Sequence, residues 1–306
     1  MAAGEGWTRT VVVMRSTRRA ALTVAAALGV LAVASPAGAA EETAPSTVGY
    51  DVSYPQCDTE LPDDAAYAVI GVNGGIATTE NPCLADQWEW ATSSSGAVSA
   101  QPRAQLYVNT ANPGEVREQV STWPRSGVNR YGVCDGGNSA ACSYEYGLDR
   151  AEDDVAMVLD TLGDLPGDAA VTEADLEGLR WWLDVETMNT WQTDGAQARR
   201  NNRATLEGMA DHLTSTGGEV GLYSTGWQWG RIVGDVPRWS SLYDLDSWLA
   251  GAQSWVGAVE NCRDEPLVGG GQVVLTQYVV DDLDHDHSCA LPQDDGAAPW
   301  TPGAPR

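Results

Sequence analysis

The sequence predicts an α/β protein whose mainly parallel sheet closes into a single TIM-like (β/α) barrel. Short apolar runs with strand character alternate with helical patterns through most of the 306 residues, as in folds built from βα units. Right-handed crossovers between such strands close naturally into a barrel. Barrels of this kind reach the length of this chain without a second domain, and no internal repeat is visible.

The expected elements follow one another in regular alternation. Strand character is found at residues 48–53, 67–72, 104–108, 181–185, 220–224, 248–250 and 273–278. Helical patterns cover residues 84–92, 115–122, 148–162 and 196–216, and Gly217-Gly218 provides a good C-terminal stop for the last of them. Two stretches fall outside this alternation and are expected to be insertions, at residues 125–145 and 163–178.

The first 39 residues have the three parts of a secretory signal peptide. Arg15, Arg18 and Arg19 form a positive region, residues 20–33 are apolar, and Ala37-Gly38-Ala39 is a small-residue cleavage site. The apolar run is too short for a membrane span, so none is expected after cleavage. Both a general-secretion and a twin-arginine signal fit, and a start at Met14 would leave residues 1–13 outside the protein. Residues 40–47 then form a linker, residues 48–290 the barrel, and residues 291–306 a disordered tail.

All six cysteines follow the expected cleavage site, and none belongs to a CxxC pair. An even number of cysteines in an exported chain predicts disulfides rather than a zinc ribbon. The sequence alone does not choose among the connectivities. Pairing neighbours along the chain gives Cys57–Cys83, Cys134–Cys142 and Cys262–Cys289 as the expected bonds.

The composition excludes several classes of partner. The chain has 17 basic and 43 acidic residues, a net charge of −26, and it should therefore repel nucleic acids and anionic membranes. No nucleophilic Ser or Cys motif and no glycine-rich phosphate loop is present, so we expect no cofactor. Because the chain contains no Phe, its Trp residues are as well explained by the core as by sugar binding.

Acidic residues occur at the ends of two expected strands. Asp51 lies in the first strand, and Asp184 and Glu186 end the fourth, where i and i+2 side chains share one face. Barrel enzymes build their active sites at the carboxyl ends of the strands. When two carboxyls are held close together at such a place, the pKa of one of them rises, and a general acid requires such a raised pKa. The alternative is that these acids cap helices or pair with Arg180 and other basic side chains.

The order of these motifs resembles the glycoside hydrolase 25 (Chalaropsis-type) lysozymes, and most closely a group of exported actinobacterial proteins with a domain of that kind. The segment Gly49-Tyr50-Asp51-Val52-Ser53 with Gln56 resembles their opening strand, and Leu183-Asp184-Val185-Glu186 is similar to their D-x-E strand. The later similarities are Gly221-Leu222-Tyr223-Ser224, Trp248-Leu249-Ala250, and Thr276-Gln277-Tyr278 with Asp284. Together they cover nearly the whole expected barrel.

The resemblance implies a secreted or wall-associated, monomeric hydrolase of cell-wall glycan. It would cleave the β-1,4 bond between N-acetylmuramic acid and N-acetylglucosamine in peptidoglycan. Glu186 would be the general acid, Asp51 and Asp184 would support the substrate or act as nucleophile, and Asp284 would complete the acidic rim. By position, the groove-lining residues would be Tyr107, Asn109, Tyr223, Gln277, Tyr278 and Trp227.

The chain also departs from this family. Gly71-Val72-Asn73-Gly74-Gly75 replaces a segment that usually carries charges, and Tyr107-Val108-Asn109-Thr110 replaces a Tyr-His-aromatic run. A barrel that binds cell-wall glycan without cleaving it is therefore the second hypothesis. Residues 281–287 are dense in Asp and His but lack the pattern of an EF-hand. We expect them to form an acidic loop without a metal ion. The alternative is a zinc site at His285 and His287, for which the sequence offers no third ligand.

Overall fold

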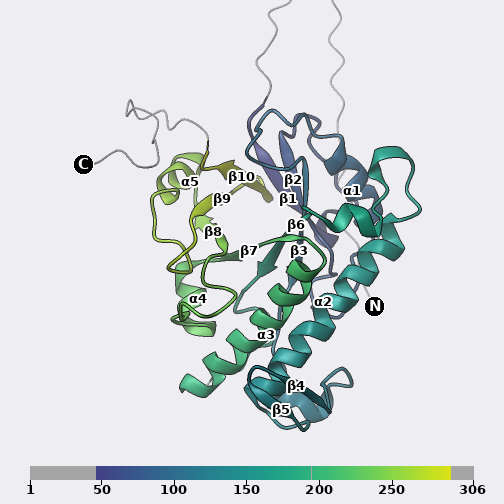
Figure 1. Cartoon of the computed structure of the whole chain (residues 1–306). Coiled ribbons are helices and arrows are strands. Elements are labelled where there is room, and N and C mark those ends of the chain that lie inside the picture. Colours follow the sequence, from purple (N-terminus) through teal and green to yellow (C-terminus); the bar gives the residue numbers. More distant parts are fainter. Residues whose placement is uncertain (1–45, 194, 291–306) are drawn as a thin grey trace, which may run out of the picture. The chain divides into compact units, whose positions relative to one another are not determined.

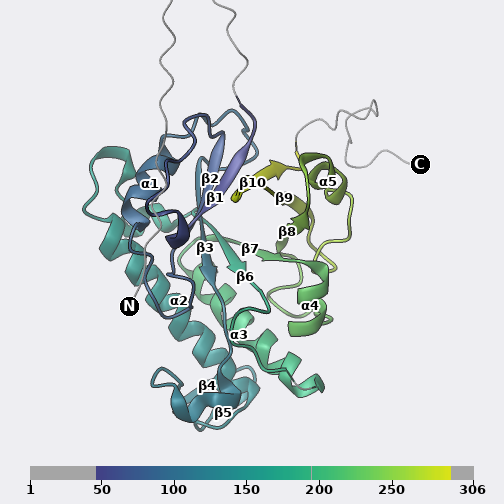
Figure 2. The ribbon, with the colours of Figure 1, turned by 180° about the vertical axis from the view of Figure 1, so that it is seen from behind.

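In the computed structural model, which describes residues 46–193 and 195–290, eight strands of the described chain close into a barrel. Their order around the barrel is β1-β10-β9-β8-β7-β6-β3-β2, and Figures 1 and 2 show them from opposite sides. The bounds are β1 Gly49–Val52, β2 Tyr67–Gly71, β3 Ala104–Asn109, β6 Arg180–Asp184, β7 Glu219–Ser224, β8 Asp246–Ala252, β9 Val273–Val280 and β10 Leu283–Ser288. The expected signal peptide, most of the linker and the expected tail lie outside the described residues.

The last strand departs from the simple alternation of strand and helix. Strands β1, β2, β3, β6, β7, β8 and β9 run parallel, whereas β10 is antiparallel to both β9 and β1. A tight turn joins β9 to β10, and its residues Asp281 and Asp282 have φ of 51° and 65°, as a two-residue hairpin requires. The expectation of an acidic loop at residues 281–287 was therefore wrong, because most of this segment forms the strand that closes the barrel.

The α-helices lie outside the barrel. Their bounds are α1 Leu84–Thr92, α2 Ala140–Leu162, α3 Gly195–Ser215, α4 Gly226–Ile232 and α5 Trp255–Asn261. Helix α1 was predicted with its observed bounds, and α3 to within one residue. Helix α2 begins earlier than predicted, the expected helix at residues 115–122 is a 3-10 helix over Gly114–Gln119, and α4 and α5 were not predicted.

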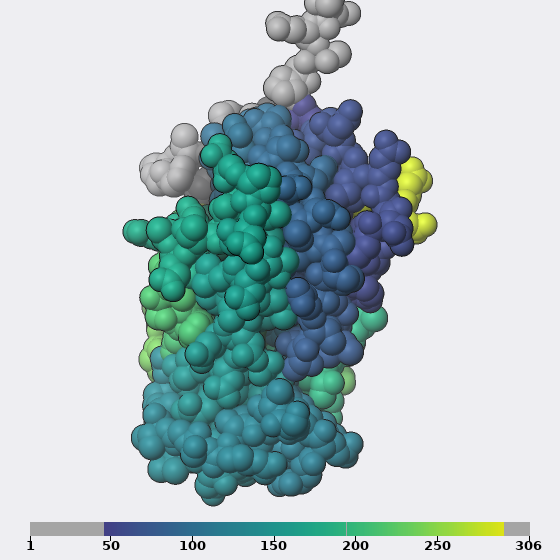
Figure 3. Space-filling model, turned by 90° about the vertical axis from the view of Figure 1, so that its right-hand side faces the viewer, coloured from purple at the N-terminus to yellow at the C-terminus, as the bar shows by residue number. Residues whose placement is uncertain are grey.

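Helices α2 and α3 lie side by side (Figures 1 and 2) because each carries a glycine at the contact. A Cβ atom on Gly147 of α2 would lie 2.0 Å from the carbonyl oxygen of Thr205, and one on Gly208 of α3 would lie 2.2 Å from that of Tyr144. Figure 3 shows a face of the molecule formed largely by the blue and teal segments, which include α1 and α2.

Alternation along the strands divides the core into two layers. Outward-facing side chains such as Ile70, Leu106 and Leu183 pack under the helices, as the two-residue period of a strand requires. Inward-facing side chains fill the barrel, among them Trp182 and Trp248. Trp181, Trp191 and Trp229 are also buried, whereas Trp227 is exposed.

The three expected disulfides are confirmed. Cys57–Cys83 joins the turn after β1 to the start of α1, and Cys262–Cys289 joins the end of α5 to the end of β10. Cys134–Cys142 lies in the first expected insertion, where β4 (Gly127–Asn129) and β5 (Gly132–Cys134) form a hairpin beside the first turns of α2. In the described part of the chain, no helix is long and apolar enough to cross a membrane.

Candidate active site

The structure brings the four acids predicted from the sequence to the same end of the barrel. Asp51 lies near the end of β1, Asp184 is the last residue of β6, Glu186 follows two residues later, and Asp284 lies in β10. The charges of all four act on the hydroxyl of Tyr223 in β7, and together with burial they raise the pKa of that group. The acids therefore form one cluster around Tyr223.

Asp51 lies inside the barrel and is only 7 % exposed. The side-chain amide of Gln277 donates to its Oδ2 at 3.0 Å and accepts from the Tyr223 hydroxyl at 2.9 Å. Asp51 and Asp284 are directly opposite each other in the antiparallel pair of β1 and β10. Burial raises the pKa of the Asp51 carboxyl well above its usual range, and the charges of Asp286 and Asp284 add to the shift.

Asp184 is 4 % exposed and is held from the neighbouring strand. The side-chain amide of Asn109 in β3 donates to its Oδ2 at 2.7 Å. Among the described residues, its Oδ1 has no partner with ordinary hydrogen-bond geometry, although the side chain of Asn189 is near enough to lower the pKa of the carboxyl. Burial, and next the charge of Glu186, raise the pKa of the Asp184 carboxyl well above its usual range, so the protonated form of Asp184 is favoured relative to that of an exposed carboxyl.

Glu186 and Asp284 are the two predicted acids that remain partly exposed to solvent. The side-chain amide of Gln228 in α4 donates to Oε1 of Glu186 at 3.4 Å. Burial raises the pKa of Asp284, and the second cause is the charge of Glu186. The two carboxyls therefore lie close enough for their charges to interact, and both are partly exposed.

A fifth acid, Asp286, belongs to the cluster and was not predicted as a site residue. It is 1 % exposed, and among the described residues neither of its carboxylate oxygens has a partner with ordinary hydrogen-bond geometry. Burial raises its pKa well above the usual range, followed by the charge of Asp284. Asp284 and Asp286 stand at i and i+2 of one strand, and this spacing was the available signal.

The predicted groove-lining residues take different places. Gln277, Tyr223 and Asn109 hold the acids, as described above. The ring of Tyr107 lies inside the barrel over Gly71, where an added Cβ would be 2.6 Å from its Cζ. Tyr278 is placed on the outer face of β9 among Ala252, Ala258 and the ring of His285. Burial and then the charge of Asp286 raise the pKa of its hydroxyl, but its ring does not line the barrel interior with the four predicted acids.

Trp227, the last of the predicted groove residues, is 66 % exposed at the start of α4, next to the Gln228 that binds Glu186. The Arg231 guanidinium lies 5.6 Å from the centre of its ring. The Trp227 side chain is therefore accessible to solvent beside the residue that binds Glu186, with Arg231 over one face of its ring.

Negative charge dominates the cluster. Among the described residues, the charges that act on the Asp51, Asp184 and Asp286 carboxyls are those of other carboxylates. The described residues contain no group of three or more His, Cys, Asp or Glu side chains arranged to hold a metal ion. Chemically, this arrangement offers three buried carboxyls with raised pKa values, Asp51, Asp184 and Asp286, beside two partly exposed carboxyls, Glu186 and Asp284.

The sequence matches no family model, and no curated protein matches it significantly. The structure is similar to that of a muramidase from Trichobolus zukalii, with a TM-score of 0.43, 15 % identity, and coverage of 79 % of this chain and 93 % of the muramidase. It is also similar to a family 25 glycosyl hydrolase from Bacillus anthracis, with a TM-score of 0.42, 13 % identity, and coverage of 78 % and 87 % of the two chains.

Proposed function

We propose that this protein is an exported glycan hydrolase that cleaves the β-1,4 bond between N-acetylmuramic acid and N-acetylglucosamine in peptidoglycan. The observation that carries the proposal is the convergence of Asp51, Asp184, Glu186 and Asp284 around Tyr223 at the carboxyl end of the barrel. Glycoside hydrolysis needs a carboxylic acid beside the leaving oxygen and a second carboxyl near the anomeric carbon.

In this mechanism Glu186 protonates the glycosidic oxygen as its bond to the anomeric carbon breaks. The acetamido oxygen of the substrate, or the carboxylate of Asp284, stabilises that carbon until water attacks it. The water molecule supplies the new hydroxyl group and returns a proton to Glu186, so the enzyme is regenerated. The raised pKa of Asp184 disfavours a second negative charge beside Glu186 once Glu186 has given up its proton.

The surroundings of the cluster suit an extended glycan. Large apolar side chains are exposed on the segments that follow the parallel strands, namely Tyr54 after β1, Ile76 after β2, Met188 after β6, Trp227 after β7 and Trp255 after β8. In a parallel barrel these segments surround the end at which the acids lie. Aromatic faces at such a rim can pack on sugar rings, while their edges stay in contact with water.

Export is part of the proposal. The N-terminal segment has the composition of a signal peptide, and all six cysteines are joined in disulfides, which persist in oxidising compartments. We propose that the protein acts outside the cell, on the wall.

Binding without cleavage is the second candidate, and a specific observation favours it. Asp51 and Asp184 are 7 % and 4 % exposed, so both are nearly closed off from a ligand bound at this end of the barrel. Such a protein would hold wall glycan at the apolar rim and leave the bond intact.

Release of new reducing ends from purified peptidoglycan distinguishes the two candidates. We expect release by the wild type, loss of release in Glu186→Gln, and normal release in Asp282→Asn, a control at an exposed position in the β9–β10 turn. If the folded wild type releases no reducing ends but sediments with the wall, the hydrolase proposal fails and the binding barrel remains.

A further inference from the structure

A chain of hydrogen bonds leads from the outside of the barrel to Asp184. It begins at Asp154 in α2, whose Oδ1 accepts from the side-chain amide of Asn73 at 2.8 Å. Oδ1 of Asn73 accepts from the backbone N–H of Asn109 at 2.7 Å, and Nδ2 of Asn109 donates to Asp184 at 2.7 Å. All four residues are at least nine-tenths buried.

The chemistry of its two ends gives this chain one orientation. A backbone N–H can only donate, so the Asn73 oxygen must face Asn109, and the Asn73 amide nitrogen must face the carboxylate of Asp154. The Asn109 amide nitrogen likewise faces the acceptor on Asp184. Asn73 lies in one and Asn109 in the other of the two segments in which the sequence departs from the lysozyme pattern. The two departures therefore contribute to the same chain of hydrogen bonds.

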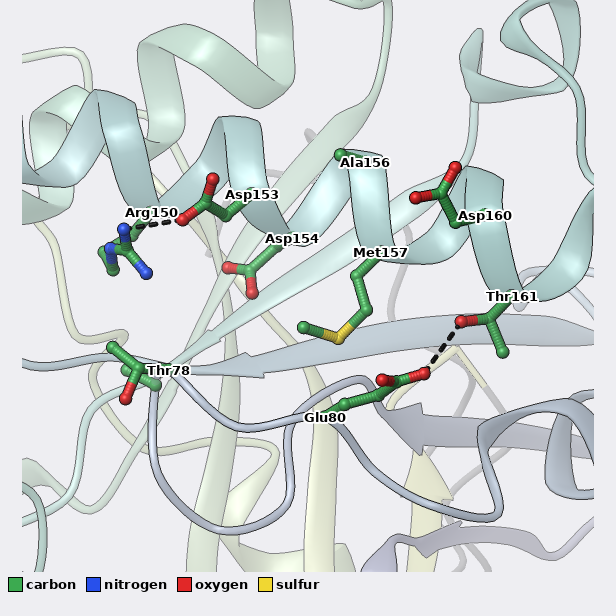
Figure 4. Close-up of a pocket in the computed structure, with 10 residues that line it drawn as sticks. Thr78, Glu80, Arg150, Asp153, Asp154, Ala156, Met157, Asp160 and Thr161 are labelled. Carbon is green, nitrogen blue, oxygen red and sulfur yellow. Dashed lines mark hydrogen bonds and ion pairs between the residues drawn. The ribbon is translucent and has the colours of Figure 1, made fainter. Parts of the chain in front are cut away.

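Asp154 borders a cavity of about 340 Å³ between α2 and the loop after β2. Figure 4 shows Asp154 on α2 between Arg150 and Met157, where it faces the loop that carries Thr78 and Glu80. Arg150 forms an ion pair with Asp153 at 2.6 Å, and Oδ2 of Asp154 has no partner among the described residues.

The charge on Asp154 depends on pH in the neutral range. Burial raises the pKa of its carboxyl to about 7, against the lowering effects of the Asn73 hydrogen bond and of Arg150, and the charge of Asp153 raises it slightly. The other titratable groups that line the cavity are Glu80, from the loop, and Asp160, on α2. The charge of Asp154 also acts on the Tyr146 hydroxyl.

We propose that Asp154 is a positioning residue that orients the Asp184 carboxyl through Asn73 and Asn109, and that loss of its proton tightens this chain. An ionised carboxylate is a stronger acceptor than a protonated one, so ionisation holds the Asn73 amide more firmly. The amide in turn fixes Asn109 and the face that Asp184 presents to Glu186. The catalytic consequence rests on the function proposed above, whereas the hydrogen-bonded coupling does not.

Two-dimensional NMR of the ¹⁵N-labelled full chain tests the coupling without any activity. The signals of the Asn109 backbone and side-chain N–H groups should shift with a midpoint near pH 7 in the wild type. Asp154→Asn keeps an acceptor for Asn73 and should abolish this shift. Asp160→Asn, at the edge of the same cavity, should retain it. A pH-independent Asn109 signal in the wild type, or an unchanged titration in Asp154→Asn, would overturn the proposal.

Kinetics on peptidoglycan give the second readout. Asp154→Asn resembles the protonated residue, so it should match the wild type near pH 5.5 and fall behind in kcat by about tenfold near pH 8.5, with KM changed less than kcat. A general loss of fold would lower activity equally at both pH values and would contradict positioning. If the wild type has no activity at all, the proposed function fails, and the NMR titration still decides the coupling.

Discussion

Replacing Asp286 by Asn should stabilise the protein at slightly alkaline pH. The side chain is 1 % exposed, and among the described residues neither carboxylate oxygen has a partner with ordinary hydrogen-bond geometry. The Trp248 indole and the Asp51 carboxyl lower its pKa by weaker contacts that do not offset the effect of burial. A buried polar group without partners costs about 1–3 kcal/mol, and more when it is charged. Asparagine keeps the shape and cannot ionise, so we expect the free energy of unfolding to rise by about 2 kcal/mol near pH 8.

The dependence on pH follows from the raised pKa of Asp286. Between the unfolded pKa, about 4, and the higher folded value, the folded state holds a proton that the unfolded state has released. The free energy of unfolding then falls by about 1.4 kcal/mol per pH unit for each such proton. This contribution is complete below the unfolded pKa and is lost as pH rises through the folded pKa. The raised pKa values of Asp51 and Asp184 act in the same direction.

Urea denaturation followed by Trp fluorescence between about pH 5 and pH 8 measures this effect. The wild type should lose stability as pH rises, and Asp286→Asn should lose it less steeply. Asp175→Asn is the control, because hydrogen bonds from Thr172 lower the pKa of this exposed carboxyl. Its contribution is lost only at more acidic pH, so the slope should not change. Equal slopes for the wild type and Asp286→Asn, or a less stable variant near pH 8, would refute the reasoning.

Two further substitutions test the helix packing and the rim. Gly208→Ala should lower the free energy of unfolding by about 3 kcal/mol, because the added Cβ meets the backbone of α2. Gly230→Ala is the control, because a Cβ at Gly230 would have open space around it. Thermal melts should show a lower Tm for Gly208→Ala and an unchanged Tm for Gly230→Ala. Trp227→Ala should weaken binding to peptidoglycan in a sedimentation assay by up to tenfold without changing the Tm. Trp239 is equally exposed and lies before β8, so Trp239→Ala should leave this binding unchanged. Equal binding by both variants would exclude a role for Trp227.

The seven parallel strands could be predicted because strands buried on both faces are continuous apolar runs. Strand β10 could not, since five of its six residues are polar or charged, and its local pattern is typical of a loop. It forms because the tight turn from β9 returns the chain beside β1, where both of its edges find hydrogen-bond partners. Helices α4 and α5 have seven residues each, which is too short for a clear helical period.

The candidate site, like the fold, could be predicted only in part from the sequence. Acids at strand ends could be found from the sequence, and Asp286 could have been found from its spacing to Asp284. The chain from Asp154 to Asp184 could not, because its members come from four separate segments and meet only in the folded barrel. Tyr278 was misplaced because it directly follows Gln277, and neighbours in a strand face opposite sides.

The placement of the acids argues that they are kept for function rather than for stability. Toward the amino-terminal ends of the strands, the barrel interior is filled by side chains such as Tyr67, the first residue of β2, and Trp182, so this fold can close its interior with aromatic groups. At the other end, Asp51, Asp184 and Asp286 are buried, and the charges acting on them come from other carboxylates. Buried acids of this kind destabilise the folded state unless they stay protonated. Buried carboxyls with raised pKa values lower the stability of the folded protein. Their concentration at one end of the barrel is expected if that end is a site that transfers protons.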